Sequence, residues 1–237
     1  MSDGASLAFL SAGAAQGLVL AVQPLFEAAG GATLQGRFGA VGAMKEELLA
    51  GREPSDLFIS THKMVQELAI DGTLRAASAA PLGRVRTGVA VRVGERVPEI
   101  DTAEALRSAL AAATALYFPD PQRATAGIYF ARVLGELGLA ESTRARWRTF
   151  PNGATAMREL AASGPAGALG CTQASEILIT PGVQLVGPLP QRFELATLYT
   201  AAVATGARQP EWAQRFIALL SAPAQQATRA RCGFEEP

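Results

Sequence analysis

Small and hydroxyl-bearing residues gather where several strand-like segments end. Three of these groups continue directly into a segment with a helical pattern. The first turn of a helix has unpaired backbone N–H groups and about half a positive charge, and small residues let a ligand approach the backbone closely. This combination favours anion binding. The candidate binding residues are Ser11, Gly13, Ala14, Val41, Gly42, Ser60, Arg123, Thr125, Ala126, Gly127, Asn152, Cys171 and Thr172.

A few side chains could add charge or proton transfer to such a site. Arg123 precedes the helix-like segment at Gly127 and could pair bidentately with a carboxylate, although a solvated surface arginine has the same pattern. His62, the single histidine, and Glu176 are candidates for a general base. His62 could equally begin a helix and face solvent. Cys171 has no base near it in the sequence, which favours a small buried residue over a nucleophile.

Metal and cofactor chemistry has little support in the sequence. Cys171 and Cys232 are the only cysteines, they are far apart, and there is no CxxC motif. One histidine with scattered carboxylates does not form a zinc site. We therefore expect neither a metal nor a cofactor, and a disulfide between the two cysteines stays open.

The composition is that of an ordinary globular protein. The chain has 237 residues, of which 49% are apolar and 18% are charged, and its 21 basic and 21 acidic side chains cancel. This balance argues against nucleic acid or a membrane surface as partner, and we expect a monomer. No apolar run reaches the roughly 20 residues that span a bilayer. The start, MSDGASLAFLSAG, lacks a signal-peptide pattern, so we expect either a cytoplasmic protein or a periplasmic one whose leader has been removed.

Strand-like and helix-like segments alternate along the chain. This order predicts an α/β fold with parallel-rich sheets flanked by helices. In such sheets ligands bind at the carboxyl ends of the strands, where the candidate residues lie. The predicted strands are Leu7–Ser11, Thr33–Phe38, Asp56–Ser60, Val85–Val93, Thr114–Phe118, Arg148–Phe150, Ala166–Cys171, Val183–Pro188 and Phe193–Val203. The predicted helices are Ala15–Ala29, Ala43–Ala50, His62–Asp71, Glu104–Ala112, Gly127–Leu137, Thr155–Ala162, Pro210–Ser221 and Ala222–Arg231.

Two of the predicted strands have the character of crossings between lobes. They are Val85–Val93, which alternates and is rich in β-branched residues, and Phe193–Val203. The prediction is therefore a discontinuous first lobe of residues 1–84 and 192–237, a second lobe of residues 85–191, and a ligand cleft between the lobes. Pro24 falls inside the first predicted helix and argues against an unbroken helix there.

Four stretches carry a resemblance to a known family. They are LAFLSAGAAQGLVLAVQPLFEAAGG from Leu7, GRFGAVGAMKEELLAGREPSDLFISTHKMVQELAIDGTL from Gly36, FPDPQRATAGIYFARVLGELGL from Phe118, and FPNGATAMRELAASGPAGALGCTQA from Phe150. Within the second stretch, GREPSDLFIS at Gly51–Ser60 matches a signature of the family. The four stretches resemble the molybdate-binding branch of the type II periplasmic solute-binding proteins, and the similarity spans nearly the whole chain. The resemblance implies two lobes that close over a small anion and an ABC transporter as partner.

Some positions depart from the family pattern. The serines that bind the oxyanion in the family correspond here to Ala14 and to Val41 or Gly42, and Cys171 stands in place of a tyrosine. Each hydrogen bond to a charged group contributes roughly 1.5–3 kcal/mol, so molybdate loses binding energy here. Relatives of this branch include isomerases of small tricarboxylates such as aconitate. Three functions stay open: a solute-binding protein for an oxyanion or small carboxylate, such an isomerase, and a cytoplasmic sensor domain.

Overall fold

The computed structural model describes residues 6–236, which form two compact units. Unit 1 contains the residues up to 84 and those from 197 on, and unit 2 contains residues 85–196. The boundaries drawn from the sequence fall after residues 84 and 191. Strands β4 (Ala80–Arg92) and β9 (Ala196–Val203) each contain residues of both units, so they carry the chain from one unit to the other.

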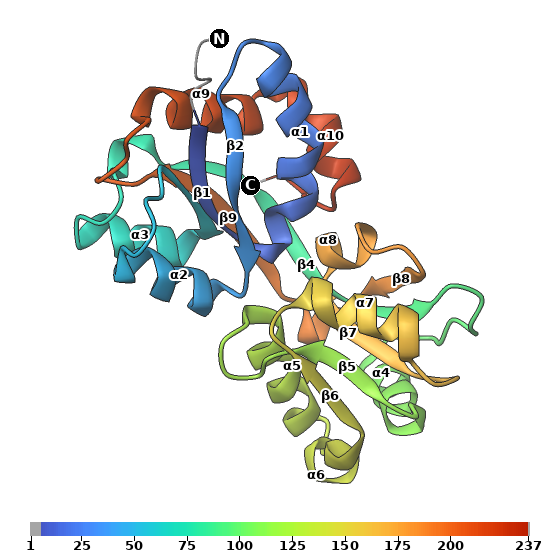
Figure 1. Cartoon of the computed structure of the whole chain (residues 1–237). Coiled ribbons are helices and arrows are strands. Elements are labelled where there is room, and N and C mark those ends of the chain that lie inside the picture. Colours follow the sequence, from blue (N-terminus) through green and yellow to red (C-terminus); the bar gives the residue numbers. More distant parts are fainter. Residues whose placement is uncertain (1–5, 237) are drawn as a thin grey trace. The chain divides into compact units, whose positions relative to one another are not determined.

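The sheet of unit 1 has the strand order β2–β1–β3–β9 (Figure 1). Strand β1 is parallel to β2 and β3, whereas β9 is antiparallel to β3. Helices connect the parallel strands, as a parallel pairing requires. The elements of unit 1 other than the crossing strands are β1 (Ser6–Ala12), η1 (Gly13–Ala15), α1 (Gln16–Ala28), β2 (Thr33–Gly39), α2 (Val41–Ala50), β3 (Leu57–Thr61), α3 (His62–Ile70), η2 (Ala76–Ser78), α9 (Pro210–Ser221), η5 (Pro223–Gln225) and α10 (Gln226–Arg231).

The sheet of unit 2 has the strand order β8–β4–β7–β5–β6 (Figure 1). Strand β5 is parallel to β6 and β7, and β4 is antiparallel to both β7 and β8. The predicted α/β fold with parallel-rich sheets is confirmed. The other elements of unit 2 are α4 (Ala103–Ala112), β5 (Leu116–Pro119), α5 (Thr125–Glu136), α6 (Ala140–Thr143), η3 (Arg144–Arg146), β6 (Trp147–Phe150), α7 (Gly153–Ser163), β7 (Leu169–Gln173), α8 (Ala174–Leu178), β8 (Val183–Pro188) and η4 (Gln191–Phe193).

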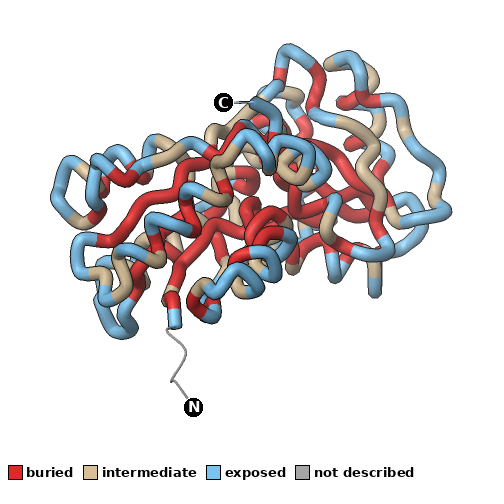
Figure 2. Tube along the Cα trace, turned by 90° about the horizontal axis from the view of Figure 1, so that it is seen from above, coloured by how far each residue is buried: buried red, intermediate tan, exposed pale blue. Residues whose placement is uncertain are grey.

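The central strands of each sheet are buried, whereas the outer strands β2, β6 and β8 are partly exposed, and helices cover the sheet faces. Figure 2 shows most of the strand trace in the colour of buried residues, while the exposed segments follow the outer sides of helices and the loops. Successive side chains of β5 point to opposite faces of the sheet, where they pack against different helices. Phe118 packs in one cluster of unit 2 with Phe130 of α5, whereas Tyr117 packs in another with Met157 of α7. Two hydrophobic layers therefore hold α5 and α7 on opposite faces of the same sheet.

Helix α1 continues through Pro24 without a break, which differs from the sequence-based expectation. Proline at this position removes the hydrogen bond to the carbonyl of Leu20, four residues earlier. Both residues lie on the exposed side of the helix, where water can satisfy that carbonyl. Leu18, Val22 and Phe26 form the buried side and hold the helix against the unit.

Two short helices in unit 2, α6 and α8, were not predicted. Neither exceeds five residues, which is too short for a periodic apolar pattern to develop. Within the described residues, no helix combines the length and apolar character that crossing a bilayer needs.

Candidate functional site

In unit 1 the carboxyl ends of β1, β2 and β3 meet at one edge of the sheet. Ala12, the last residue of β1, pairs with Gly39 at the end of β2. Ser11 pairs with Ile59, which places Ser60 beside Ala12. The strand register therefore brings together three of the loops predicted to bind a ligand.

Helix α2 begins at this edge without a side-chain cap. Val41 and Gly42 form its first turn, so their N–H groups have no intrahelical acceptor. Ser60 is fully buried, and its hydroxyl has no hydrogen-bond partner among residues 6–236. Ser60 shares a strand face with Phe58, which packs against Met44 of α2. The candidate anion position in unit 1 is therefore an uncapped helix start with a buried, unpaired hydroxyl on the same strand face.

The other predicted residues of unit 1 divide into backbone and side-chain roles. Gly13 and Ala14 are buried in η1, which begins without a side-chain cap. Ser11 donates its hydroxyl to the carbonyl of Ala12 at 3.0 Å, so this side chain already has a partner. His62 is half-buried at the start of α3, and its Nδ1 lies 3.0 Å from Oγ1 of Thr200.

In unit 2 the helix α5 also begins without a side-chain cap. Thr125, Ala126 and Gly127 form its first turn, which follows β5 after the short turn of residues 120–124. A Cβ at Gly127 would overlap with the carbonyl oxygens of Pro119 and Asp120, so glycine lets the helix start against the strand end. Arg123 lies exposed in the turn between β5 and α5. This uncapped first turn is the candidate anion position in unit 2.

The start of α7 is different, because its N–H groups already have acceptors within the unit. The side chain of Asn152 accepts a hydrogen bond from the Thr155 N–H at 2.8 Å and caps the helix. The carboxyl group of Glu176 accepts hydrogen bonds from the backbone N–H groups of Gly153 and Ala154. The anion position at this helix start is therefore filled by the protein's own carboxyl group.

Glu176 is 5% exposed and has two further hydrogen bonds. The hydroxyl of Thr172 donates to its Oε2 at 2.5 Å. The backbone N–H of Gln173 donates to the same carboxyl group, as in a capping box. Because the side chains of Asn152 and Thr172 form hydrogen bonds within the unit, neither contributes to the candidate anion position at the start of α5. Burial raises the pKa of Glu176, and these hydrogen bonds oppose that shift only in part.

Replacing Glu176 with glutamine should change how stability depends on pH. A carboxyl group whose folded-state pKa is raised contributes most stability below its ordinary value of 4.5, and the contribution is lost as pH rises through the folded-state pKa. The free energy of unfolding of the wild type, relative to E176Q, should therefore fall as pH increases above 4.5. Urea unfolding at several pH values between 4 and 8 measures this difference, and a difference that stays constant would contradict the assignment.

Cys171 does not contribute its side chain to either candidate anion position. Its thiol packs in the core of unit 2 with Val89 and Leu169, and burial strongly raises its pKa. Both Cys171 and Cys232 are free. Gln173, two residues after Cys171 on the same face of β7, was not among the predicted residues. It is 3% exposed, and its amide has no hydrogen-bond partner within the described residues.

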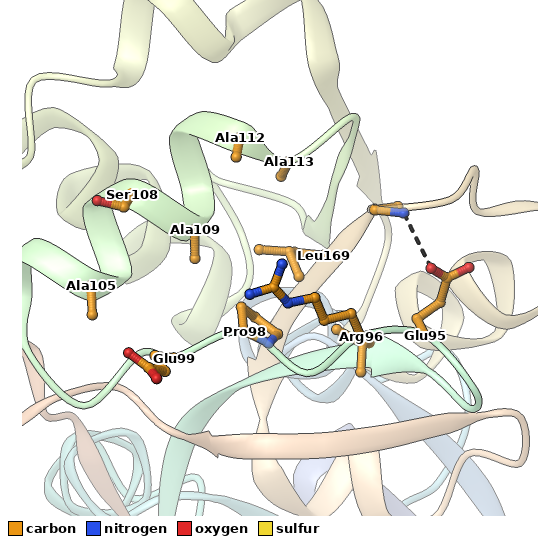
Figure 3. Close-up of a pocket in the computed structure, with 13 residues that line it drawn as sticks. Glu95, Arg96, Pro98, Glu99, Ala105, Ser108, Ala109, Ala112, Ala113 and Leu169 are labelled. Atoms are coloured by element: carbon orange, nitrogen blue, oxygen red, sulfur yellow. Dashed lines mark hydrogen bonds between the residues drawn. The ribbon is translucent and has the colours of Figure 1, made fainter.

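Unit 2 also contains a cavity of about 570 Å³, which does not include the start of α5. It is lined by Gly167 and Leu169 at the amino-terminal end of β7 and by alanines of α4, whereas α5 begins at the carboxyl ends of the strands. Figure 3 shows Arg96 extending beside Pro98 and Leu169, while Glu95 accepts a hydrogen bond from the Gly167 N–H at 3.4 Å. Its charged side chains have both signs, which does not favour an anion. Within residues 6–236, no group of His, Cys, Asp and Glu side chains is arranged to hold a metal ion.

Comparison with known proteins identifies the family. Residues 7–235 match the family of bacterial extracellular solute-binding proteins. The chain belongs to this family. The solute-binding protein is 29% identical over 223 residues to an aconitate isomerase of a Pseudomonas species, with 91% of this chain and 82% of the relative covered.

Solved structures confirm the predicted fold, and molybdate- and sulfate-binding proteins are among the structural neighbours. The periplasmic molybdate-binding protein of Azotobacter vinelandii superposes with a TM-score of 0.80 at 19% identity, over 98% of this chain and 99% of that one. The sulfate-binding protein of Mycobacterium tuberculosis superposes with a TM-score of 0.74 at 18% identity, over 98% of this chain and 87% of that one. At these identities the likeness shows the fold alone.

Proposed function

We propose that this protein is a solute-binding protein that binds one small anion, an oxyanion or a small carboxylate, for an ABC-type transporter. The observation that carries the proposal is the pair of uncapped helix starts at strand ends. Helix α2 supplies one in unit 1 and helix α5 supplies one in unit 2, each with unpaired N–H groups. Because the formal net charge is zero, attraction for an anion must come from such local groups.

The side chains around these helix starts favour a ligand other than molybdate. Ala14, Val41 and Gly42 supply no hydroxyl groups at the positions where the resemblance places the oxyanion-binding serines. Ser60 offers a hydroxyl at the end of β3 in unit 1, since its Oγ has no partner among the described residues. An anion that relies on backbone N–H groups and one hydroxyl, such as a small carboxylate, fits this set better than a tetrahedral metal oxyanion.

A thermal-shift titration with molybdate, tungstate, sulfate, citrate and cis-aconitate tests the proposal. A true ligand at 100 times its Kd stabilises the folded state by about 2.7 kcal/mol and raises the melting temperature. We expect citrate or cis-aconitate to do so more strongly than molybdate. The S60A variant should weaken binding about tenfold or more, as the loss of a hydrogen bond to a charged group predicts.

The matched control is S163A, because Ser163 is exposed at the end of α7 and bonds only to Glu159 of the same helix. This variant should bind as the wild type does. If none of the five anions raises the melting temperature, the protein does not bind small anions of these classes and the proposal fails.

A tricarboxylate isomerase is the second candidate, and the likeness to the Pseudomonas aconitate isomerase favours it. Proton abstraction beside a carboxylate needs a base within hydrogen-bond reach of the substrate. Glu176 is engaged by Thr172 and by backbone N–H groups, which leaves half-buried His62 as the better candidate. Following cis- and trans-aconitate by NMR in the same titration separates the two functions. Turnover that H62Q abolishes would establish the isomerase, whereas binding without turnover supports the binding protein.

A further inference from the structure

Three buried side chains of unit 2 have polar atoms without a partner in the described part of the chain. Both the amide nitrogen and the amide oxygen of Gln173 are unpaired, and so are the hydroxyls of Thr87 and Ser175. All three residues are buried, and Gln173 is only 3% exposed. Buried polar atoms in folded proteins nearly always have a partner, so these three side chains, in addition to the Nε of partly buried Arg92, call for an explanation.

These residues lie together at one end of the sheet of unit 2. Thr87 on β4 is the cross-strand partner of Gln173 on β7, so the two side chains stand next to each other on the same face. Ser175 follows two residues later in the first turn of α8. The three residues are therefore neighbours, Thr87 and Gln173 as a cross-strand pair and Gln173 and Ser175 along the chain.

The face that carries Gln173 and Thr87 is the one covered by α5. Cys171 and Val89, two residues before and after them on the same strands, pack in the cluster that contains Phe130 of α5. Helix α5 begins where β5 ends and runs back along the sheet, and β5 is parallel to β7. Its uncapped first turn therefore lies at the end of the sheet where Gln173 stands. The unpaired amide and the unpaired helix N–H groups therefore lie at the same end and on the same face of this sheet.

The chemistry of these groups defines what can satisfy them. The amide nitrogen of Gln173 and the two hydroxyls can donate hydrogen bonds, but the amide oxygen of Gln173 only accepts. Sulfate and molybdate, and carboxylates without a hydroxyl, only accept at neutral pH. They leave the amide oxygen without a partner. A ligand that carries both a carboxylate and a hydroxyl can satisfy every group.

We propose that Gln173, Thr87 and Ser175 bind the hydroxyl-bearing part of a small hydroxycarboxylate whose carboxylate lies at the start of α5. This inference rests on the proposed anion-binding function and specifies its ligand class. The hydroxyl of the ligand donates to the amide oxygen of Gln173, while the amide nitrogen and the two side-chain hydroxyls donate to oxygen atoms of the ligand.

Isothermal titration with two matched ligand pairs tests this assignment. Citrate differs from tricarballylate, and malate from succinate, by one hydroxyl group. We expect the wild type to bind the hydroxylated member of at least one pair about tenfold or more tightly, because a site built to bond a hydroxyl discriminates against an analogue that lacks it. In Q173L that preference should disappear while the des-hydroxy ligand keeps its affinity within a few-fold.

The matched control is Q184L, since Gln184 is a partly buried glutamine on β8 of the same unit. It should retain the preference. T87V provides a second, nearly isosteric variant should Q173L fold poorly, and it should reduce the preference as well. Equal binding of both members of each pair by the wild type overturns the inference, and so does a preference that survives in Q173L and T87V.

The outcomes also separate this inference from the proposed function. If the protein binds only molybdate or sulfate, or only tricarballylate and succinate, the anion-binding function stands. The hydroxycarboxylate assignment is then overturned. If no anion binds at all, the proposed function and the inference fail together.

Discussion

Replacing Gly153 with alanine should destabilise the protein by about 2–4 kcal/mol. The added Cβ would overlap with the hydroxyl of Thr172 and with the carboxyl group of Glu176. Overpacking a buried position costs about 1–3 kcal/mol, and this position also disturbs the hydrogen bonds of a buried carboxyl group. Because Gly153 begins α7, the helix cannot shift away without losing the bonds from its own N–H groups to Glu176. Urea unfolding followed by circular dichroism measures the change.

Gly135 offers a matched control for this substitution. It lies exposed in α5 of the same unit, and a Cβ added there would have no atom within 4 Å. G135A should therefore stabilise the protein by about 0.5–1 kcal/mol, the usual gain from alanine over glycine within a helix. If G153A were as stable as the wild type, the contacts between the start of α7 and Glu176 described above would be wrong.

The fold could be predicted from the sequence because short-range patterns determine most of its elements. Apolar runs such as Leu57–Thr61 end in small or hydroxyl-bearing residues and are followed by amphipathic segments, which is the signature of a parallel sheet with helices. Burial then follows from the same alternation, as Tyr117 and Phe118 show by packing on opposite faces. Pro24 misled the prediction because its effect depends on which side of the helix faces solvent.

The site could be predicted only as a set of strand ends. Ser60 and Thr125 were found because a hydroxyl at the end of a strand-like run is visible in the sequence. The sequence could not show that Glu176 fills the start of α7, because its partner Gly153 lies on another element. Gln173 was missed for a related reason. Whether a polar side chain has a partner depends on its tertiary neighbours, and Gln173 ends a strand of mostly small residues.

Replacing Asp56 with alanine should destabilise the protein by about 3–5 kcal/mol. Asp56 is 2% exposed and precedes β3 in unit 1. Its carboxylate accepts hydrogen bonds from the backbone N–H groups of Ala8, Arg208 and Gln209, at 2.9, 2.6 and 2.8 Å. It thereby connects β1 to the segment that begins α9, although these segments are about 200 residues apart along the chain. Alanine would leave these donors without their acceptor, and each unsatisfied buried group costs about 1–3 kcal/mol.

Comparison with D56N and D71A identifies the cause of the loss. Asparagine keeps one acceptor oxygen, so D56N should lose less stability than D56A. Asp71 also accepts a backbone hydrogen bond, from Thr73 at 3.0 Å, but it does so at an exposed turn where water can replace it. D71A should therefore cost less than about 1 kcal/mol by the same urea measurement. Equal losses in D56A and D71A would mean that the three bonds of Asp56 contribute no more than one surface bond. In that case α9 must be held in unit 1 mainly by packing against α1, where Phe26 contacts Phe216.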